Sequence, residues 1–407
     1  MLKKNIAYSA FGQVSTACFN FWAIYILLAT YGMTRYSSLV IAQSLILFID
    51  NICNPHNSEA YVEIFSTKQL EEKKEVLKIV GIEFLISIFS LFVCMFVAFF
   101  LGKYFNWSYL TIICIYDLSY TLLFNVNGII SGFIRYQKKF LIISVHSIIF
   151  SAIYLLLIIL VYYNSFEFED VIKCISILNV IKNIVLFYIF FVLLKNMCRN
   201  REEDNKQKKG LLSKLAWCHL TSIVDSPVQY LDTIFIAKFS TNISGIYKII
   251  CQFLYLFSLL GNCISQVYLP EFSNMIFEKE IYKIKNILSK VSIISLLISL
   301  VLYIIFLPIL VFMFLKFLNL KIIIFIALVL ILNLYSFSTR LVHVLFVSFG
   351  FFKQNFYITL ITNFLYVLII YVVGRYLDIY SVVFANIIQV ILNVKLKKYI
   401  INRRCSN

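Results

Sequence analysis

The sequence predicts an all-α integral membrane protein with about twelve transmembrane helices, arranged in two lobes of about six helices each. Apolar residues make up 61% of the 407 residues and charged residues only 14%, which is far from the composition of a soluble domain. The apolar stretches are long and continuous, whereas a membrane β-barrel would have short alternating segments. The basic residues also gather in every second gap between these stretches. Together these features indicate a multi-pass helical protein.

The expected spans follow one another along the chain, each long enough to cross a bilayer, which takes about 20 residues. In order they cover 5–30, 37–58, 79–101, 108–131, 141–163, 171–194, 211–237, 244–269, 290–315, 322–349, 355–374 and 379–396. The longest hydrophilic stretch, 197–210, lies between the sixth and seventh spans. We therefore expect an N-terminal lobe at 1–196, a cytoplasmic linker at 197–210 and a C-terminal lobe at 211–407.

The distribution of Lys and Arg predicts the orientation of the helices, because cytoplasmic loops retain basic residues. The gaps on one side carry most of them, including clusters at 68–78, 195–214 and 395–404, whereas the gap at 164–170 on the other side is acidic. Both termini are therefore expected in the cytoplasm. These short loops also explain the formal net charge of +16, so no nucleic-acid partner is expected.

Weak similarity between the two halves predicts an internal repeat. One offset along the chain sets Ser37 beside Gly245 and Asn54 beside Asn262, and GFIRYQKKF at 132–140 resembles GFFKQNF at 350–356. Because each half has an even number of spans, the repeats would be parallel and related by a pseudo-twofold axis along the membrane normal. Such a pair encloses a central cavity between the lobes.

Ionisable residues within the spans are the first candidates for a transport site, since each costs at least a few kcal/mol if it faces lipid. The acidic candidates are Asp50, Glu83, Asp117, Asp225 and Asp232, and the basic ones are Lys182, Lys248 and Arg340. For Asp232, Lys248, Glu83 and Lys182, anchoring at the membrane interface or capping of a helix is an alternative interpretation.

Polar residues at helical spacing suggest which helix faces line the cavity. They are Thr221, Asp225, Gln229 and Asp232 in the seventh span, Asp117, Thr121, Asn125 and Gly128 in the fourth, and Ser336, Arg340 and His343 in the tenth. Pro227 is expected to kink the seventh helix or to free a backbone carbonyl there. A structural ion pair between Arg340 and Asp225 or Asp117 is the alternative to a binding role for Arg340.

One segment carries a resemblance to a known family. The stretch LDTIFIAKFSTNISGIY at 231–247, followed by VYLPEFS at 267–273, resembles the start of the second lobe in bacterial polysaccharide-repeat flippases. These are the Wzx-type O-antigen translocases of the multidrug/oligosaccharidyl-lipid/polysaccharide exporter superfamily, to which the multidrug exporters called MATE also belong. The matching positions are Asp232, Gly245, Tyr247 and Pro270. In the first lobe, the Leu-Gly usual before the second helix is a displaced Tyr31-Gly32.

The resemblance implies a V-shaped, MATE-like transporter of the bacterial inner membrane. It would move undecaprenyl-diphosphate-linked oligosaccharide from the cytoplasmic to the periplasmic leaflet by alternating access, beside a polysaccharide polymerase and a chain-length regulator. Such a head group needs cations for its phosphates and hydroxyl or amide groups for its sugars. We expect Arg340 as the leading diphosphate ligand, Lys248, Lys182, Gln229 and Asn125 as further substrate contacts, and Asp225, Asp232, Asp117 and Asp50 as coupling or gating carboxylates.

Other functional classes find less support in the sequence. It has no Walker A pattern, no Ser/His/Asp constellation and no metal-ligand spacing, so we expect no enzyme activity, no metal and no cofactor. Transport would then be driven by a proton or sodium gradient or by consumption of the product. An O-antigen polymerase is an alternative, but its large periplasmic loop is missing here. The second alternative is a cation-coupled multidrug exporter of the same superfamily.

Overall fold

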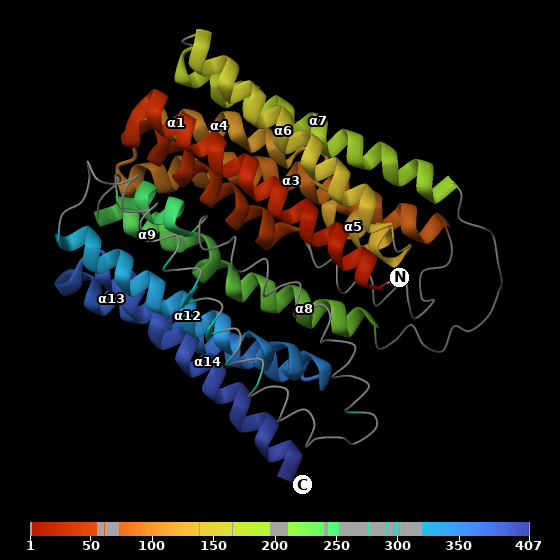
Figure 1. The fold of residues 1–407 in the computed structure, drawn as a ribbon, viewed down its shortest axis with the longest axis vertical. Coiled ribbons are helices and arrows are strands. Elements are labelled where there is room, and N and C mark those ends of the chain that lie inside the picture. Colours follow the sequence, from red (N-terminus) through yellow and green to blue (C-terminus); the bar gives the residue numbers. More distant parts are fainter. Residues whose placement is uncertain are drawn as a thin grey trace. The chain divides into compact units, whose positions relative to one another are not determined.

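The computed structural model describes residues 2–54, 61, 73–137, 139–164, 166–195, 211–239, 243–251 and 320–406, with isolated helical positions between 276 and 304. Helices account for nearly all of these residues (Figure 1). The chain forms two compact units, Met1–Gly245 and Ile246–Asn407. The prediction of an all-α protein is therefore confirmed.

The first unit is built around its N-terminal helix, α1 (Leu2–Cys53), which packs against α6, α4, α3 and the segment from α8 to α9. The other elements of this unit are α3 (Lys73–Phe105), α4 (Tyr109–Ser119), η1 (Tyr120–Leu122), α5 (Asn127–Tyr136), α6 (Phe140–Asn164), α7 (Phe168–Lys195), α8 (Leu211–Ser226), η3 (Pro227–Leu231) and α9 (Asp232–Phe239). The predicted boundary at the linker 197–210 does not coincide with the division between the compact units, because α8, η3 and α9 contact α1. Whether the predicted lobes are repeats is a separate matter and stays a prediction.

Gly32 divides α1 into two helical parts. The apolar part of α1 covers 43 residues, or about 65 Å at 1.5 Å per residue, roughly twice the hydrocarbon core of a bilayer. Gly32 has φ 77° and ψ 172°, a backbone conformation that glycine adopts at no steric cost. The two parts correspond to the first and second predicted spans. The expected gap at 31–36 is reduced to this single residue.

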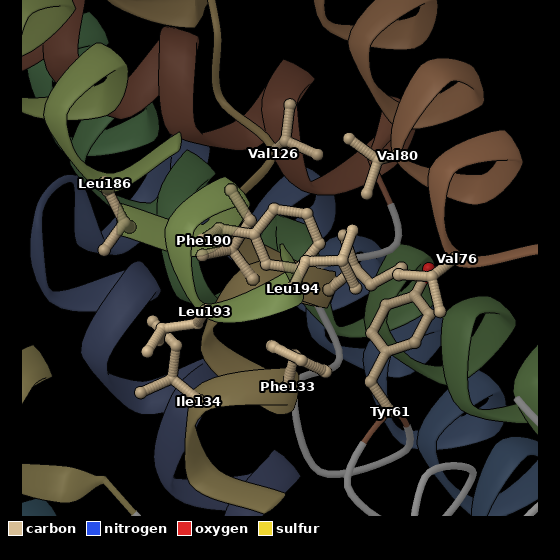
Figure 2. Close-up of a cluster of buried hydrophobic side chains, with 12 residues drawn as sticks. Tyr61, Val76, Val80, Val126, Phe133, Ile134, Leu186, Phe190, Leu193 and Leu194 are labelled. Atoms are coloured by element: carbon tan, nitrogen blue, oxygen red, sulfur yellow. The ribbon is translucent and has the colours of Figure 1, made fainter. Parts of the chain in front are cut away.

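An apolar cluster joins α3, α5 and α7 in the first unit (Figure 2). The rings of Phe133 and Phe190 meet edge to face at its centre, 5.3 Å apart. Tyr61, from the connection between α1 and α3, inserts its ring and donates a 2.6 Å hydrogen bond from its hydroxyl to Glu83 Oε1. Glu83 is buried, so the interpretation of Glu83 as an interface residue is wrong. Its carboxylate instead anchors the tyrosine within the cluster.

The second unit contains the rest of the helix at 243–251, followed by α12 (Leu320–Ser348), α13 (Phe352–Leu377) and α14 (Tyr380–Ser406). In this unit, α14 packs against both α12 and α13. An apolar cluster includes Leu345, Phe346 and Ile401. The last three predicted spans match these helices. Most of the predicted eighth and ninth spans lies outside the described residues; the positions described between 290 and 304 are helical.

Seven of the described helices are long and apolar enough to cross a membrane, or eight if the bent pair α4–η1 and α5 counts as one span. Their outer faces are apolar as well: Phe89, Phe92 and Phe96 on α3 are 62% to 65% exposed. Exposed aromatic side chains on successive turns of one helix suit contact with lipid rather than with water. The protein is thus a multi-pass membrane protein. The cytoplasmic placement of its termini stays a prediction.

Candidate functional site

The fourth predicted span is broken, which corrects the expectation of one continuous helix over 108–131. α4 begins at the cap Ser108 and continues through η1, but the chain leaves helical geometry at Leu123, which is extended, and Phe124 has φ 58°. The helix resumes as α5 at an angle of 44°. Consequently Asp117 and Thr121 lie on one side of the break and Gly128 on the other, so the predicted polar stripe does not lie on a single helix face.

Asn183 of α7 satisfies the backbone that this break exposes. Its side-chain Nδ2 donates to the carbonyl oxygens of Thr121 and Leu123, at 3.1 Å each. Unpaired backbone groups are costly at membrane depth and are tolerated only where neighbouring side chains or waters pair with them. One buried amide therefore allows the break to exist. Asn183 was not predicted as a site residue, because an isolated Asn in an apolar run gives no signal by spacing.

Asp50 and Asn125, which were predicted from different spans, meet at the break. Asp50 lies near the end of α1 and is 6% exposed. Its Oδ2 accepts a 2.6 Å hydrogen bond from Asn125 Nδ2, and its Oδ1 accepts a 2.8 Å bond from Asn54 Nδ2. Asn127 Nδ2 donates in turn to Asn125 Oδ1 at 2.6 Å. The second and fourth predicted spans are thus linked through a carboxylate and its amide neighbours.

The predicted polar face of the seventh span is interrupted by a π-turn. Pro227 is the first residue of this turn, η3, which separates α8 from α9; the α-helix is thus interrupted where a kink or a freed backbone carbonyl was expected. A π-turn has more residues per turn than an α-helix, so Asp232 is rotated out of register with Asp225. Asp225 is half-buried. The side chain of Gln229 lies outside the described part of the chain.

Asp232 is buried at the start of α9, 7% exposed. Its Oδ1 accepts hydrogen bonds from the backbone N–H of Thr233 at 2.6 Å and from the hydroxyl of Thr233 at 3.2 Å. Asp232 itself has helical backbone dihedrals (φ −52°, ψ −44°), so the helix continues from η3 into α9, and its roles as an anchor, a cap or a coupling carboxylate stay predictions. A separate hydrogen bond links α1 to α8. Asn51, the residue after Asp50 in α1, donates from Nδ2 to the carbonyl oxygen of Ser222 in α8 at 3.1 Å.

Asp117 and Lys182 are two further candidates in the first unit. Asp117 on α4 is half-buried, and its Oδ2 is buried without a hydrogen-bond partner in the structure. Lys182 lies at the middle of α7, half-buried, and its carbonyl oxygen is 3.1 Å from Nε2 of His146. Because a carbonyl only accepts, His146 donates from Nε2. His146 is therefore a packed side chain that is hydrogen-bonded to the backbone of α7.

The second unit brings together Arg340, His343 and Lys397. Arg340 and His343 lie on α12 one turn apart, and Lys397 lies on α14. Nζ of Lys397 is 3.0 Å from Nδ1 of His343 and 5.9 Å from the ring centroid of Phe346. Lys397 is only 6% exposed, although the sequence placed it among the basic residues of a loop. We call Arg340, His343 and Lys397 the basic cluster.

The spacing on α14 could have revealed Lys397. Gln389, Asn393 and Lys397 follow one another at intervals of four residues, which places them on one helix face. Gln389 Nε2 donates to Asn363 Oδ1 on α13 at 2.8 Å, and Asn393 Nδ2 is 3.4 Å from Thr362 Oγ1. We call this contact the α13–α14 polar seam. Lys397 lies farther along the same face of α14 and contacts His343 of α12.

The described residues of the two units differ in charge. The acidic candidates Asp50, Glu83, Asp117, Asp225 and Asp232 all lie in the first unit, with Lys182 as its mid-span cation. In the second unit, Asp378 is the one acidic residue among those described, and it is exposed in the turn between α13 and α14. Its helices carry Arg340, Lys397 and the half-buried Lys248. Among the described in-span side chains, the first unit therefore offers carboxylates to a cation and the second offers basic groups to an anion.

Comparison with solved structures identifies the class of fold. The chain is similar to an outward-facing MATE family multidrug resistance transporter of the MOP superfamily, with 13% identity, coverage of 99% of this chain and 96% of that one, and a TM-score of 0.68. It is also similar to a MOP superfamily transporter from Pyrococcus furiosus, for which reverse polarity of the binding pocket is said to suggest a different function (12% identity, 98% and 95% covered, TM-score 0.71).

A crystal structure of MATE in the bent conformation gives a comparable match, with 12% identity, 100% and 97% coverage and a TM-score of 0.69. No protein-family model matches the sequence, and no curated protein matches it. At these identities the likeness concerns the fold alone. The protein is an α-helical membrane protein with the fold of MATE transporters of the MOP superfamily.

Proposed function

We propose that the protein is a flippase for undecaprenyl-diphosphate-linked oligosaccharide repeat units, such as those of O-antigen, in the bacterial inner membrane. The observation that carries the proposal is the basic cluster of the second unit. A diphosphate is bound best by cations, and a guanidinium can bind it through two parallel hydrogen bonds. Arg340 is half-buried on α12, and the buried Lys397 contacts His343, which lies one turn of α12 after Arg340. Cations inside the helices suit an anionic head group better than a cationic drug.

The sequence match in the second lobe supports the same substrate. The stretch at 231–247 contains Asp232, Gly245 and Tyr247 in the pattern of polysaccharide-repeat flippases. The fold is compatible with this assignment, since one solved MOP superfamily transporter is described as having a binding pocket of reverse polarity. A shared fold therefore does not fix the charge of the substrate.

The remaining candidates have secondary parts in the proposal. Lys248 and Lys182 are half-buried cations within helices, suited to the phosphates or to acidic sugars. Asn125 is already bonded to Asp50, so it serves the carboxylate rather than a sugar. Asp50, Asp117, Asp225 and Asp232 belong to the coupling of transport to a proton or sodium gradient. A polysaccharide polymerase and a chain-length regulator would act on the product at the outer leaflet.

A multidrug exporter is the second candidate, and the acidic residues of the first unit favour it. Buried carboxylates attract cationic drugs as well as coupling ions, and one similar structure is that of a multidrug resistance transporter. The two candidates differ in a measurable phenotype. A flippase restores surface polysaccharide in a host that lacks its own, whereas an exporter lowers the accumulation of a cationic dye.

Replacement of Arg340 tests the proposed function. In a host in which the chain restores surface polysaccharide, Arg340→Ala should abolish export at an unchanged membrane level of the protein, and Arg340→Lys should restore it partly because an ammonium binds as a point charge. The matched control is Arg375→Ala, since Arg375 is exposed in the last turn of α13. Full export by Arg340→Ala would contradict the proposal. Dye efflux without any polysaccharide export would favour the multidrug exporter.

A further inference from the structure

The exposed residues of α12 lie on opposite sides of the helix in its two halves. In the first half they include Ala327 and Ile331, and the latter is 58% exposed. In the second half they include Ser336 and His343. Ser336 follows Ala327 by nine residues, which is two and a half turns and places the two on opposite sides of α12. The apolar side suits lipid. A polar side that is exposed at membrane depth is costly against lipid and instead suits a polar ligand.

The ring of His343 is held on one edge by Lys397 of α14. Nζ of Lys397 lies 3.0 Å from Nδ1 of His343. Because an ammonium has only donors, Nδ1 accepts, and a ring that accepts at Nδ1 carries its single proton on Nε2. In the part of the chain that the structure describes, this Nε2 has no hydrogen-bond partner, and the side chain of His343 is exposed. The ring therefore presents an oriented N–H donor on the polar side of α12.

We propose that His343 binds a phosphate oxygen of the lipid-linked diphosphate through Nε2–H, and that Lys397 positions the ring for this contact. The inference rests on the proposed function, in which Arg340 binds the same diphosphate. Arg340 lies three residues before His343, so the two side chains are neighbours on one helix face. A diphosphate carries anionic oxygens on two phosphorus atoms, which allows a guanidinium and an imidazole to donate charge-assisted hydrogen bonds side by side.

Lys397 decides which nitrogen of His343 faces the ligand as a donor. It is 6% exposed and lies 5.9 Å from the ring centroid of the buried Phe346, so it approaches His343 from the interior of the unit. The position of the proton on a neutral imidazole is set by the hydrogen bond that the other nitrogen makes. Without the ammonium, the proton could move to Nδ1, and Nε2 would then present a lone pair. A lone pair repels an anionic oxygen, so the tautomer determines whether the ring binds phosphate.

Two substitutions at position 343 separate the ligand contact from the contact with Lys397. The amide of Asn has its polar atoms at the δ position, like Nδ1, and the amide of Gln has them at the ε position, like Nε2. His343→Asn thus keeps a partner for Lys397 but loses the outer donor, whereas His343→Gln keeps that donor. In native mass spectrometry of the purified full-length protein, His343→Asn should bind undecaprenyl diphosphate about tenfold more weakly than the wild type, and His343→Gln within about threefold of it. Undecaprenol, which lacks phosphates, is the control ligand and should bind equally to all three.

Nitrogen-15 NMR of protein labelled at its four histidines reads the tautomer directly. The signals that disappear in His343→Gln belong to His343, and in the wild type they should show the proton on Nε2. The Nε2 signal should shift when undecaprenyl diphosphate is added and stay in place with undecaprenol. In Lys397→Met, part of the ring population should carry the proton on Nδ1. Lys395→Met, a change of an exposed lysine on the same helix, is the matched control and should leave the tautomer unchanged.

Four results would overturn the inference. They are a proton on Nδ1 in the wild type, an Nε2 signal that the diphosphate lipid does not shift, undiminished diphosphate binding by His343→Asn, and an equal loss of undecaprenol binding in that variant. Should His343→Asn fail to fold, the two NMR results on the wild type still decide. Failure of the wild type to bind undecaprenyl diphosphate would contradict the proposed function as well. Undiminished binding by His343→Asn together with weakened binding by Arg340→Ala would contradict this inference alone.

Discussion

The broken fourth span of the first unit and the α13–α14 polar seam of the second both place polar groups among apolar helices, yet they differ in charge. At the break, amides surround the buried carboxylate of Asp50. Along the seam, neutral groups pair with each other, as Gln389 does with Asn363, and a cation enters only where α14 reaches His343 through Lys397. Neutral pairs serve helix packing. Charged groups in the same setting are costly and need a partner, which can be a neighbouring side chain, as Tyr61 is for Glu83, or a ligand.

The two units would therefore bind opposite ions. Among the described residues, the acidic in-span side chains lie in the first unit and the basic cluster lies in the second. The proposed coupling carboxylates and the proposed diphosphate ligand Arg340 fall on the two sides of this separation. The separation also accounts for a fold that is shared with a multidrug resistance transporter while the proposed substrate is anionic.

Topology reporters give the largest expected effect, because their signal is present or absent. Fusions after Asn196 and after Asn407 should report cytoplasm, and a fusion near Glu167 should report periplasm, since the basic gaps lie on the first side and the acidic gap on the other. This orientation would place the basic cluster toward the inner leaflet. A C-terminus outside the cell would exclude parallel repeats.

Loss of Lys397 should have the next largest effect. Lys397→Met keeps the length of the side chain but removes the charge, and export should fall about 30-fold or more if the charge contacts the diphosphate, corresponding to about 2 kcal/mol. Lys395→Met is the matched control, because Lys395 is exposed on the same helix. Equal export by both variants would reduce Lys397 to a structural partner of His343.

Asp225 and Asp232 should differ in their effects on export. Asp225 is half-buried before the π-turn, whereas Asp232 is bonded to Thr233. Asp225→Asn should slow export several-fold more than Asp232→Asn if Asp225 lines the cavity. In a background without other cysteines, Asp225→Cys should react with a small membrane-impermeant thiol reagent. A thiol that stays unlabelled, together with normal export by Asp225→Asn, would make this face a packing surface.

The break and the seam should differ in stability when one amide is removed. Asn183→Ala leaves the carbonyls of Thr121 and Leu123 without their amide donor, and should cost about 1–3 kcal/mol. Asn393→Ala removes one long contact of 3.4 Å and should cost about 0.6 kcal/mol, the average for a polar contact between membrane helices. Thermal unfolding in detergent ranks the two variants. An equal or reversed ranking would contradict the role of Asn183 at the break.

Composition, apolar periodicity and the position of Pro227 were sufficient to predict the helical class, most span positions and an irregular turn in the seventh span. They could not predict the break at Leu123–Val126, because that segment is as apolar as a helix and the break depends on Asn183, about 60 residues away. Lys397 was likewise counted among loop residues, since burial of a cation follows from tertiary packing against His343. Asp50 is predicted as a single ionisable residue, and Asn125 as one member of the polar stripe of the fourth span. Their contact required the folded structure.

Lipid binding measured on two variants tests the central claim most directly, namely that the second unit holds the anionic lipid. Native mass spectrometry would follow undecaprenyl diphosphate on Asp50→Asn and Arg340→Ala purified in parallel. We predict that Asp50→Asn keeps the lipid, whereas Arg340→Ala binds the lipid about tenfold more weakly or worse. Loss of the lipid in Asp50→Asn with undiminished lipid binding in Arg340→Ala would contradict the account.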